Sequence, residues 1–180
     1  MIMKYFKKII GERVYLSPIN IDDAEVYTKW MNDYEVSGNL GNYGQMITLG
    51  SEKSILEKLA AEGQNFAVVL LEDDHLIGNI GLMYIDHINR KAEVGLFIGE
   101  PENRSRGYGA EALRLALKYG FETLNLHNIM LHVHSDNQRA IACYNKVGFQ
   151  EFGRRREALF KNGKYFDLIH MEILDTDYQI

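Results

Sequence analysis

The chain has 180 residues, of which 46% are hydrophobic and 25% charged, and this size and composition predict one domain, residues 1–180. No apolar run approaches the roughly 18 residues of a membrane span, and Met1–Ile10 lacks the long apolar region of a signal peptide. The net charge of −5 argues against general nucleic-acid binding. A single cysteine excludes an internal disulfide, and we expect a cytoplasmic protein that does not bind membranes.

The charge is unevenly distributed along the chain. Residues 1–90 contain 8 basic and 13 acidic side chains, whereas residues 91–180 contain 12 of each. The neutral part suits a polyanionic cofactor, and the acidic part could favour a cationic substrate. An acidic surface that only faces water explains the same charge, so both interpretations stay open.

The first elements are a strand and a helix. Glu12–Ser17 alternates polar and apolar residues, which predicts a strand that Pro18 ends. Asp22 or Asp23 can cap the helix that follows. The apolar side of this helix holds Ala24, Tyr27, Trp30 and Met31.

A loop, a second helix and a hairpin come next. Ser37–Gly50 is rich in Gly and Asn and is predicted to be a loop. Ser51 is expected to cap a short helix that ends at Gly63. Its inward side chains are predicted to be Ile55, Leu56 and Leu59. The hairpin comprises the strands Phe66–Leu71 and His75–Asp86, joined by a turn at Asp73-Asp74.

The most informative stretch is a strand, a glycine-rich turn and a helix. Lys91–Gly99 is apolar on both faces, which favours a central strand antiparallel to the preceding hairpin. Pro101 ends the strand, and Arg104–Ala110 opens a helix. Its apolar stripe holds Ala112, Leu113, Ala116, Leu117 and Phe121. Glycines at the start of a helix, where N–H groups are unpaired, predict a phosphate-binding site.

The last third contains a strand, a helix and a hairpin. Ile129–His134 is a predicted strand, and Ser135–Asn137 precedes a helix over Gln138–Val147 that stops at Gly148. The final strands are Phe152–Leu159 and Tyr165–Leu174, joined by Lys161-Asn162-Gly163-Lys164. This order of elements predicts an α/β (α+β) fold, with a mixed, mostly antiparallel central sheet flanked by helices.

The identity of the phosphate ligand depends on the turn. No Lys-Ser or Lys-Thr follows the glycines, so the turn is not a nucleotide-triphosphate loop. Gly107-x-Gly109-x-x-Ala112 fits a dinucleotide fingerprint, but no βα alternation surrounds it. The pattern Arg104-x-x-Gly107-x-Gly109 is the better match, because it resembles the pyrophosphate motif of the GNAT superfamily of N-acetyltransferases. The resemblance extends to Asn137…Tyr144-x-x-x-Gly148-Phe149 and covers Glu12 to Leu174.

The resemblance implies direct acetyl transfer from acetyl-CoA to a primary amine, in a single GNAT-like domain. Such a transfer needs a neutral amine and a stabilised leaving thiolate. The catalytic residues that it implies are Tyr144, the acid for the thiolate, and Glu93, a base that orders a water near the amine. The implied cofactor-binding residues are Phe97, Ile98, Gly99, Arg104, Ser105, Arg106, Gly107, Tyr108, Gly109, Ala110, Asn137 and Tyr144.

Each assignment has a structural alternative. Tyr144 could be a core tyrosine, and Glu93 could form an ion pair with Lys91 or an arginine. Asn137 could bind the pantetheine arm, cap its helix, or do both. Cys143 is a weaker candidate for a catalytic residue. It could be a nucleophile, but a lone cysteine is usually part of the core.

Histidines and arginines near the end of the chain carry two further alternatives. His132 and His134 share a strand face with His127 nearby, but two histidines do not make a metal site, and we expect no metal. Arg154-Arg155-Arg156 is expected to face solvent, with cofactor phosphate as the alternative.

The acceptor is the least determined feature. The group that the chain most resembles includes ribosomal-protein N-terminal acetyltransferases and spermidine acetyltransferases. Acidic and aromatic residues are expected to line the acceptor's approach and to favour an amine with extra positive charge. These residues are Asp33, Tyr34, Glu35, Tyr43, Tyr84, Asp86 and Asp167. A non-catalytic coenzyme A sensor and a dinucleotide oxidoreductase are the alternative functions, and a homodimer is left open.

Overall fold

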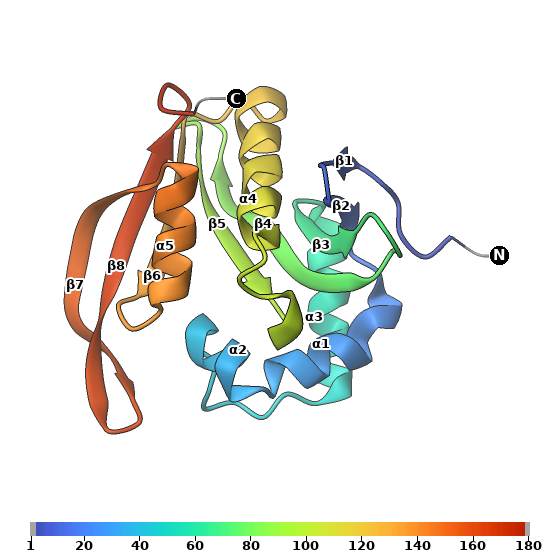
Figure 1. The fold of residues 1–180 in the computed structure, drawn as a ribbon, viewed down its shortest axis with the longest axis horizontal. Helices are drawn as coiled ribbons and strands as arrows, with labels where there is room; N and C mark the ends of the chain where they lie inside the picture. Colours follow the sequence, from blue (N-terminus) through green and yellow to red (C-terminus); the bar gives the residue numbers. More distant parts are fainter. Residues whose placement is uncertain (1–2, 179–180) are drawn as a thin grey trace. The chain divides into compact units, whose positions relative to one another are not determined.

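The computed structural model describes residues 3–178. Eight strands form a mixed, mostly antiparallel sheet in the order β1-β2-β3-β4-β5-β6-β8-β7, in which β5 and β6 are parallel, and α-helices flank it (Figure 1). The predicted fold class is therefore confirmed. Among the described residues, no helix is long and apolar enough to cross a membrane.

The chain divides into two compact units. The first comprises residues up to Gly81 together with Leu96–Leu115, and the second comprises Leu82–Gly95 and the chain from Ala116 onward. The strands β4 and β5 and the helix α4 each pass from one unit into the other. Each unit is therefore described by itself.

The first unit contains most of the N-terminal elements. They are β1 (Ile9–Ile10), β2 (Val14–Pro18), a 3-10 turn (Ile21–Asp23), α1 (Ala24–Met31), α2 (Tyr34–Leu40), α3 (Leu49–Glu62), β3 (Asn65–Leu70), the start of β4 (Leu76–Asp86), the end of β5 (Lys91–Ile98), a 3-10 turn (Pro101–Asn103) and the start of α4 (Tyr108–Lys118). Its core is aromatic where α1 meets β5, because Tyr27, Trp30 and Phe97 pack edge-to-face at centroid distances of 5.4 to 6.2 Å.

The start of the first helical segment differs from the sequence prediction. Asp23 occupies the predicted N-cap position of α1, but its side chain makes no capping hydrogen bond. In the 3-10 turn before it, the side chain of Asn20 accepts from the Asp22 N–H. Asp23 is 1% exposed and is paired with the Tyr5 hydroxyl and the Lys4 ammonium. These partners come from a segment 18 residues or more away, so local cap preference did not reveal them.

The segment predicted as a loop is partly helical. Tyr34–Leu40 forms α2, which begins at Asp33 and ends at Gly41 in the left-handed conformation. The next helix begins at Leu49, since Thr48 is its N-cap and Ser51 completes a capping box with it. Ser51 is therefore the third helical residue rather than the cap. Ile55 is 44% exposed, so its predicted inward position is wrong, whereas Leu56 is buried.

The second unit contains the remainder of the sheet. Its elements are the end of β4, the start of β5, the end of α4, a π-helical turn (Tyr119–Thr123), β6 (Asn128–His134), α5 (Gln138–Val147), β7 (Gln150–Lys161) and β8 (Lys164–Leu174). The predicted helix over Gln138–Val147 and its stop at Gly148 are confirmed. Parallel pairing of β5 with β6 extends over three residue pairs, from Lys91–Asn128 to Glu93–Met130.

The two faces of this sheet differ in chemistry. One face is apolar and buried, because Ile129 and Leu131 of β6 lie opposite Ile173 and Met171 of β8. Helix α5 lies over this face (Figure 1), with Gly148 against the Ile173 side chain. Strand side chains alternate, so the other face carries Glu93, Met130, His132, His170 and Glu172.

Candidate active site

In the first unit, Arg104 is turned toward the protein backbone. Its side chain is 5% exposed, and its guanidinium donates to the carbonyls of Ile98 at 3.1 Å and Gly99 at 2.6 Å and to the Glu35 carboxylate. Its own N–H donates to the Pro101 carbonyl. Arg104 therefore holds the end of β5 in place, and this geometry does not give its side chain the predicted contact with a phosphate.

Gly99 has a packing role as well. Its N–H donates to the Ile77 carbonyl and its own carbonyl accepts from Arg104, so both groups are already hydrogen-bonded. A Cβ at this position would overlap the indole ring of Trp30. The structure thus explains Gly99 by the close approach of Trp30, rather than by the predicted contact with the pantetheine arm. Phe97 faces the same core, and Ile98 contributes the carbonyl that Arg104 binds.

The glycine-rich turn itself is built as the sequence predicts. Ser105 and Gly107 both have positive φ, at 60° and 88°, and the second value favours glycine. Helix α4 begins at Tyr108, so Gly109 and Ala110 lie in its first turn. The first N–H groups of a helix have no intrahelical partner and attract anions.

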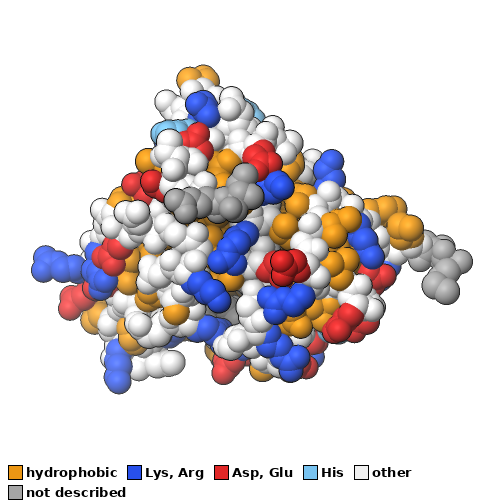
Figure 2. Space-filling view, turned by 45° about the horizontal axis from the view of Figure 1, so that its top comes forward, with side chains coloured by type: hydrophobic (Ala, Val, Ile, Leu, Met, Phe, Trp, Pro, Cys, Tyr) orange, Lys and Arg blue, Asp and Glu red, His pale blue; other side chains and the backbone are white. Residues whose placement is uncertain are grey.

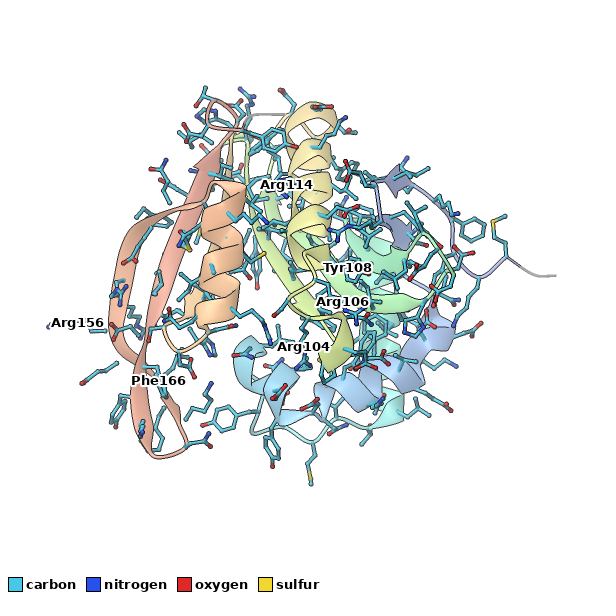
Figure 3. All side chains as sticks on the ribbon, in the orientation of Figure 1. Arg104, Arg106, Tyr108, Arg114, Arg156 and Phe166 are labelled. Atoms are coloured by element: carbon cyan, nitrogen blue, oxygen red, sulfur yellow. The ribbon has the colours of Figure 1, made fainter. Side chains whose placement is uncertain are left out.

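A clamp that the sequence analysis missed holds this turn. The Arg13 guanidinium donates to the Arg106 carbonyl at 2.9 Å, lies 5.0 Å from the centroid of the Tyr108 ring, and pairs with the Glu111 carboxylate at 3.0 Å. The other Glu111 oxygen accepts from the backbone N–H of Arg13 and Val14. Figure 3 shows Arg106 and Tyr108 beside the start of α4. We call Arg13 and Glu111 the turn clamp.

The turn clamp lowers the pKa of Glu111. Burial alone would raise it, but the hydrogen bonds from Arg13 and Val14 and the charge of Arg13 together outweigh burial. Glu111 is therefore held as a carboxylate. The two members of the clamp are 98 residues apart in sequence, which is why no local pattern reveals them.

In the second unit, Tyr144 and Asn137 lie on α5. Tyr144 is 9% exposed and its ring lies 6.0 Å from that of Phe149. Burial raises the pKa of its phenol, and the neighbouring Cys143 thiol adds to the effect. The Asn137 side chain accepts from the Ala140 N–H at 3.2 Å, which confirms the helix cap. Its amide nitrogen is a further donor that the cap does not use.

Glu93 has a partner that the sequence analysis did not foresee. Its carboxylate lies 2.7 Å from Nδ1 of His132, not beside Lys91 or an arginine, and its side chain is 17% exposed. His127 is paired elsewhere, with Asp175 at 2.8 Å. The described residues contain no cluster of His, Cys, Asp and Glu that could hold a metal.

Most of the acidic residues that were predicted to line the approach of the acceptor bind other groups of the protein. Asp33 caps α2, and Glu35 pairs with Arg104. Asp167 binds Arg154 and the Glu157 N–H. Asp86 accepts hydrogen bonds from Asn89 and Ile88, and these bonds together with the charge of Lys91 lower its pKa. Within the described residues, Asp33 and Asp86 form no salt bridge, whereas arginines pair with the other two.

On the face drawn in Figure 2, basic side chains gather in the lower middle, and acidic and apolar side chains are interspersed around them. The Arg154-Arg155-Arg156 run is exposed, as predicted, and Arg156 points outward from β7 (Figure 3).

The comparisons with known proteins identify the class. The family model of the acetyltransferase (GNAT) domain matches residues 13–150, so the chain belongs to the GNAT acetyltransferase family. It is accordingly an N-acetyltransferase whose acetyl donor is acetyl-CoA.

The chain is also similar to individual N-acetyltransferases. The chain is 40% identical to a spermidine N(1)-acetyltransferase of Vibrio cholerae over 104 residues, 58% of this chain and 60% of that protein. It is 34% identical to a ribosomal N-acetyltransferase-like protein of Bacillus subtilis over 110 residues, 61% of this chain and 60% of that one. The crystal structure of spermidine N-acetyltransferase from Vibrio cholerae with CoA and spermine aligns with a TM-score of 0.84 and 28% identity, covering 93% of this chain and 99% of that one.

Proposed function

We propose that the protein transfers an acetyl group directly from acetyl-CoA to a primary amine that carries extra positive charge, either a polyamine or the N-terminus of a basic peptide. The observation that carries this proposal lies within the second unit. Glu93 and the helix that bears Tyr144 lie on opposite faces of one sheet, and the pairing of β5 with β6 ends at Glu93. A base and an acid on opposite faces suit a reaction in which the amine enters from one side and the thiolate leaves from the other.

The cofactor's pyrophosphate binds the turn of the first unit in this proposal. The groups that hold it are the backbone N–H groups and side chains from Ser105 to Ala110, which the turn clamp fixes in position. Arg104 supports the turn through β5 rather than by contact. In the second unit, the free amide nitrogen of Asn137 is the proposed donor to the pantetheine arm.

Transfer then needs three proton movements. The protonated amine first loses one proton to Glu93, directly or through a water, and its lone pair attacks the thioester carbonyl carbon. The carbon–sulfur bond breaks, and the departing thiolate takes the proton of the Tyr144 hydroxyl. The nitrogen, which still carries two hydrogens after the attack, releases the second proton, and this proton restores the Tyr144 hydroxyl. The Tyr144 phenol is protonated at neutral pH with or without the shift. Burial raises its pKa and so weakens it as an acid, but the hydroxyl remains a hydrogen-bond donor to the developing thiolate charge.

The choice of a cationic acceptor rests on two supports. Asp33 and Asp86 form hydrogen bonds but no salt bridge among the described residues, and the relatives include enzymes named for spermidine. A peptide N-terminus shares the same chemistry, since it is also a cationic primary amine. We also propose a cytoplasmic location, based on the single cysteine of the chain.

A screen of amines tests the proposed acceptor. Thiol release from acetyl-CoA should be fastest with spermine, spermidine or a basic peptide, and slower with neutral amino acids. The preference should weaken with salt, because the Debye length falls from about 10 Å at 0.1 M to about 3 Å at 1 M. A best substrate that is neutral or acidic, or a preference that ignores salt, contradicts the cationic acceptor.

A further inference from the structure

We propose that His132 is a positioning residue that holds the Glu93 carboxylate in the orientation it needs as a base. This inference rests on the proposed function. It adds a second side chain to the base, so that the working unit is a Glu93–His132 pair rather than Glu93 alone.

The geometry of the pair follows from the sheet. Glu93 lies opposite Met130 in the last parallel pair of β5 and β6, and His132 is two residues further along the same face of β6. Diagonal neighbours of this kind are within reach of long side chains. Nδ1 of His132 lies 2.7 Å from one carboxylate oxygen, Oε1, a distance typical of a charge-assisted hydrogen bond.

This contact fixes which atoms can react. A carboxylate only accepts, so Nδ1 of His132 must carry the hydrogen and donate it to Oε1. That bond leaves Oε2 of Glu93 to take the proton from the amine. A histidine that holds a carboxylate in one orientation reduces the number of unproductive rotamers that the base can adopt.

Glu93 and His132 differ in their exposure to solvent and in their neighbours. The Glu93 side chain is 17% exposed, whereas that of His132 is 48% exposed. The His170 ring, directly across on β8, lies 6.3 Å from the His132 ring, and its other ring neighbour is Phe152 at 6.0 Å. On the same face, Glu172 is bound by the Asn128 amide at 2.8 Å. His132 is therefore the side chain that contacts Glu93, and His170 provides a matched control.

Substitutions at His132 test the role in turnover. His132→Ala should lower kcat about tenfold and leave KM for acetyl-CoA and the melting shift on adding acetyl-CoA unchanged. His132→Asn should recover most of kcat, because the Asn amide nitrogen occupies the place of Nδ1. The control His170→Asn should stay within about twofold of the wild type. An alanine variant with full kcat, or an asparagine variant as slow as the alanine variant, would overturn the proposal.

A double variant tests whether the two residues act together. Since His132 acts through Glu93, adding His132→Ala to Glu93→Gln should cause little further loss, whereas independent roles would multiply. Multiplying losses contradict the proposal.

A measurement without turnover separates this inference from the proposed function. Nitrogen NMR of the ring, at a pH where the imidazole is neutral, reports which nitrogen carries the hydrogen. We expect Nδ1–H in His132 of the wild-type protein and loss of that preference in Glu93→Ala. The Nε2–H form in the wild type would overturn the pair even if the protein acetylates amines. Conversely, the protein could show the Nδ1–H ring and acetylate no amine. This result would establish the hydrogen bond but refute the proposed function, and His132 would then have no base to position.

Discussion

Individual side chains in this protein have roles that depend on their burial. Tyr144 is one case, because burial raises the pKa of its phenol, which keeps the hydroxyl as a hydrogen-bond donor while making it a weaker acid. We predict that Tyr144→Phe lowers kcat about 10²-fold or more, the usual worth of general acid catalysis. Binding of acetyl-CoA, measured by calorimetry, should stay near normal because the ring remains. A loss below about threefold would make Tyr144 a packing residue.

Arg104 and Arg106 are predicted to differ although both belong to the same motif. Arg104 is buried and holds two carbonyls and Glu35, so Arg104→Ala should lower the free energy of unfolding by about 2–3 kcal/mol. Arg106 is exposed, so Arg106→Ala should leave unfolding within about 0.5 kcal/mol and weaken acetyl-CoA binding. Urea unfolding and calorimetry of both variants check this. The reverse pattern would place Arg104 on the phosphate.

Sequence reasoning at the residue scale finds motif positions better than their partners. The spacing of Gly107 and Asn137 indicated the turn and the cap, and both are present. It could not show that the Arg104 side chain binds the end of β5 and Glu35, or that Glu93 contacts His132, since these contacts depend on how the segments pack. A side chain's direction and its tertiary partner are not encoded in local spacing.

At the scale of elements, the turn clamp fixes the start of α4. The folded-state pKa of Glu111 lies below its ordinary value of 4.5, so the stabilisation is present above about pH 4.5 and is lost as the pH falls through the folded-state pKa. We predict that Glu111→Gln lowers the free energy of unfolding at pH 7 by about 1–3 kcal/mol, and that this difference shrinks toward pH 3. Unfolding with urea at several pH values measures it.

A matched control for this prediction is Glu57→Gln, an exposed acid on α3. It should leave the free energy of unfolding within about 0.5 kcal/mol at both pH values. If Glu111→Gln loses the same stability at pH 3 as at pH 7, the charge of Glu111 is not what the clamp needs.

Regular elements were predicted well where their sequence signals are local. The helix over Gln138–Val147 carries its cap and its glycine stop within a few residues, and its bounds agree. The hairpin at Asn162-Gly163 likewise has both turn residues at positive φ. The short helix α2 was missed because its sequence, Tyr34–Leu40, contains Gly and Asn and has little intrinsic helix propensity. Capping by Asp33 and the pairing of Glu35 with Arg104 accompany this helix.

At the scale of the whole molecule, the fold class was predictable because the order of strands and helices is characteristic. The single-domain prediction and the homodimer both stay predictions. The motif pattern predicted the family as well, but the acceptor depends on charges that only the structure shows to be compensated or free. Glu35 and Asp167 looked like selecting charges in the sequence and are neutralised by arginines in the fold.

Cofactor binding should be visible as stabilisation of the entire protein. Acetyl-CoA at about 100 times its dissociation constant should add about 2.7 kcal/mol to the free energy of unfolding, and NAD should add none. Differential scanning calorimetry with each ligand measures the shift. Equal melting temperatures with and without saturating acetyl-CoA would contradict the assignment of the glycine-rich turn to its pyrophosphate.

The central claim is that this protein catalyses acetyl transfer to a cationic amine rather than only binding coenzyme A. The most direct test is one incubation with acetyl-CoA and an equimolar mixture of spermine, a basic peptide and a neutral amine, analysed by mass spectrometry together with titration of free thiol. We predict acetylated cationic amines, one thiol released per acetyl group transferred, and no acetylated protein. Stable binding of acetyl-CoA with no acetylated amine would contradict the claim and indicate a non-catalytic sensor.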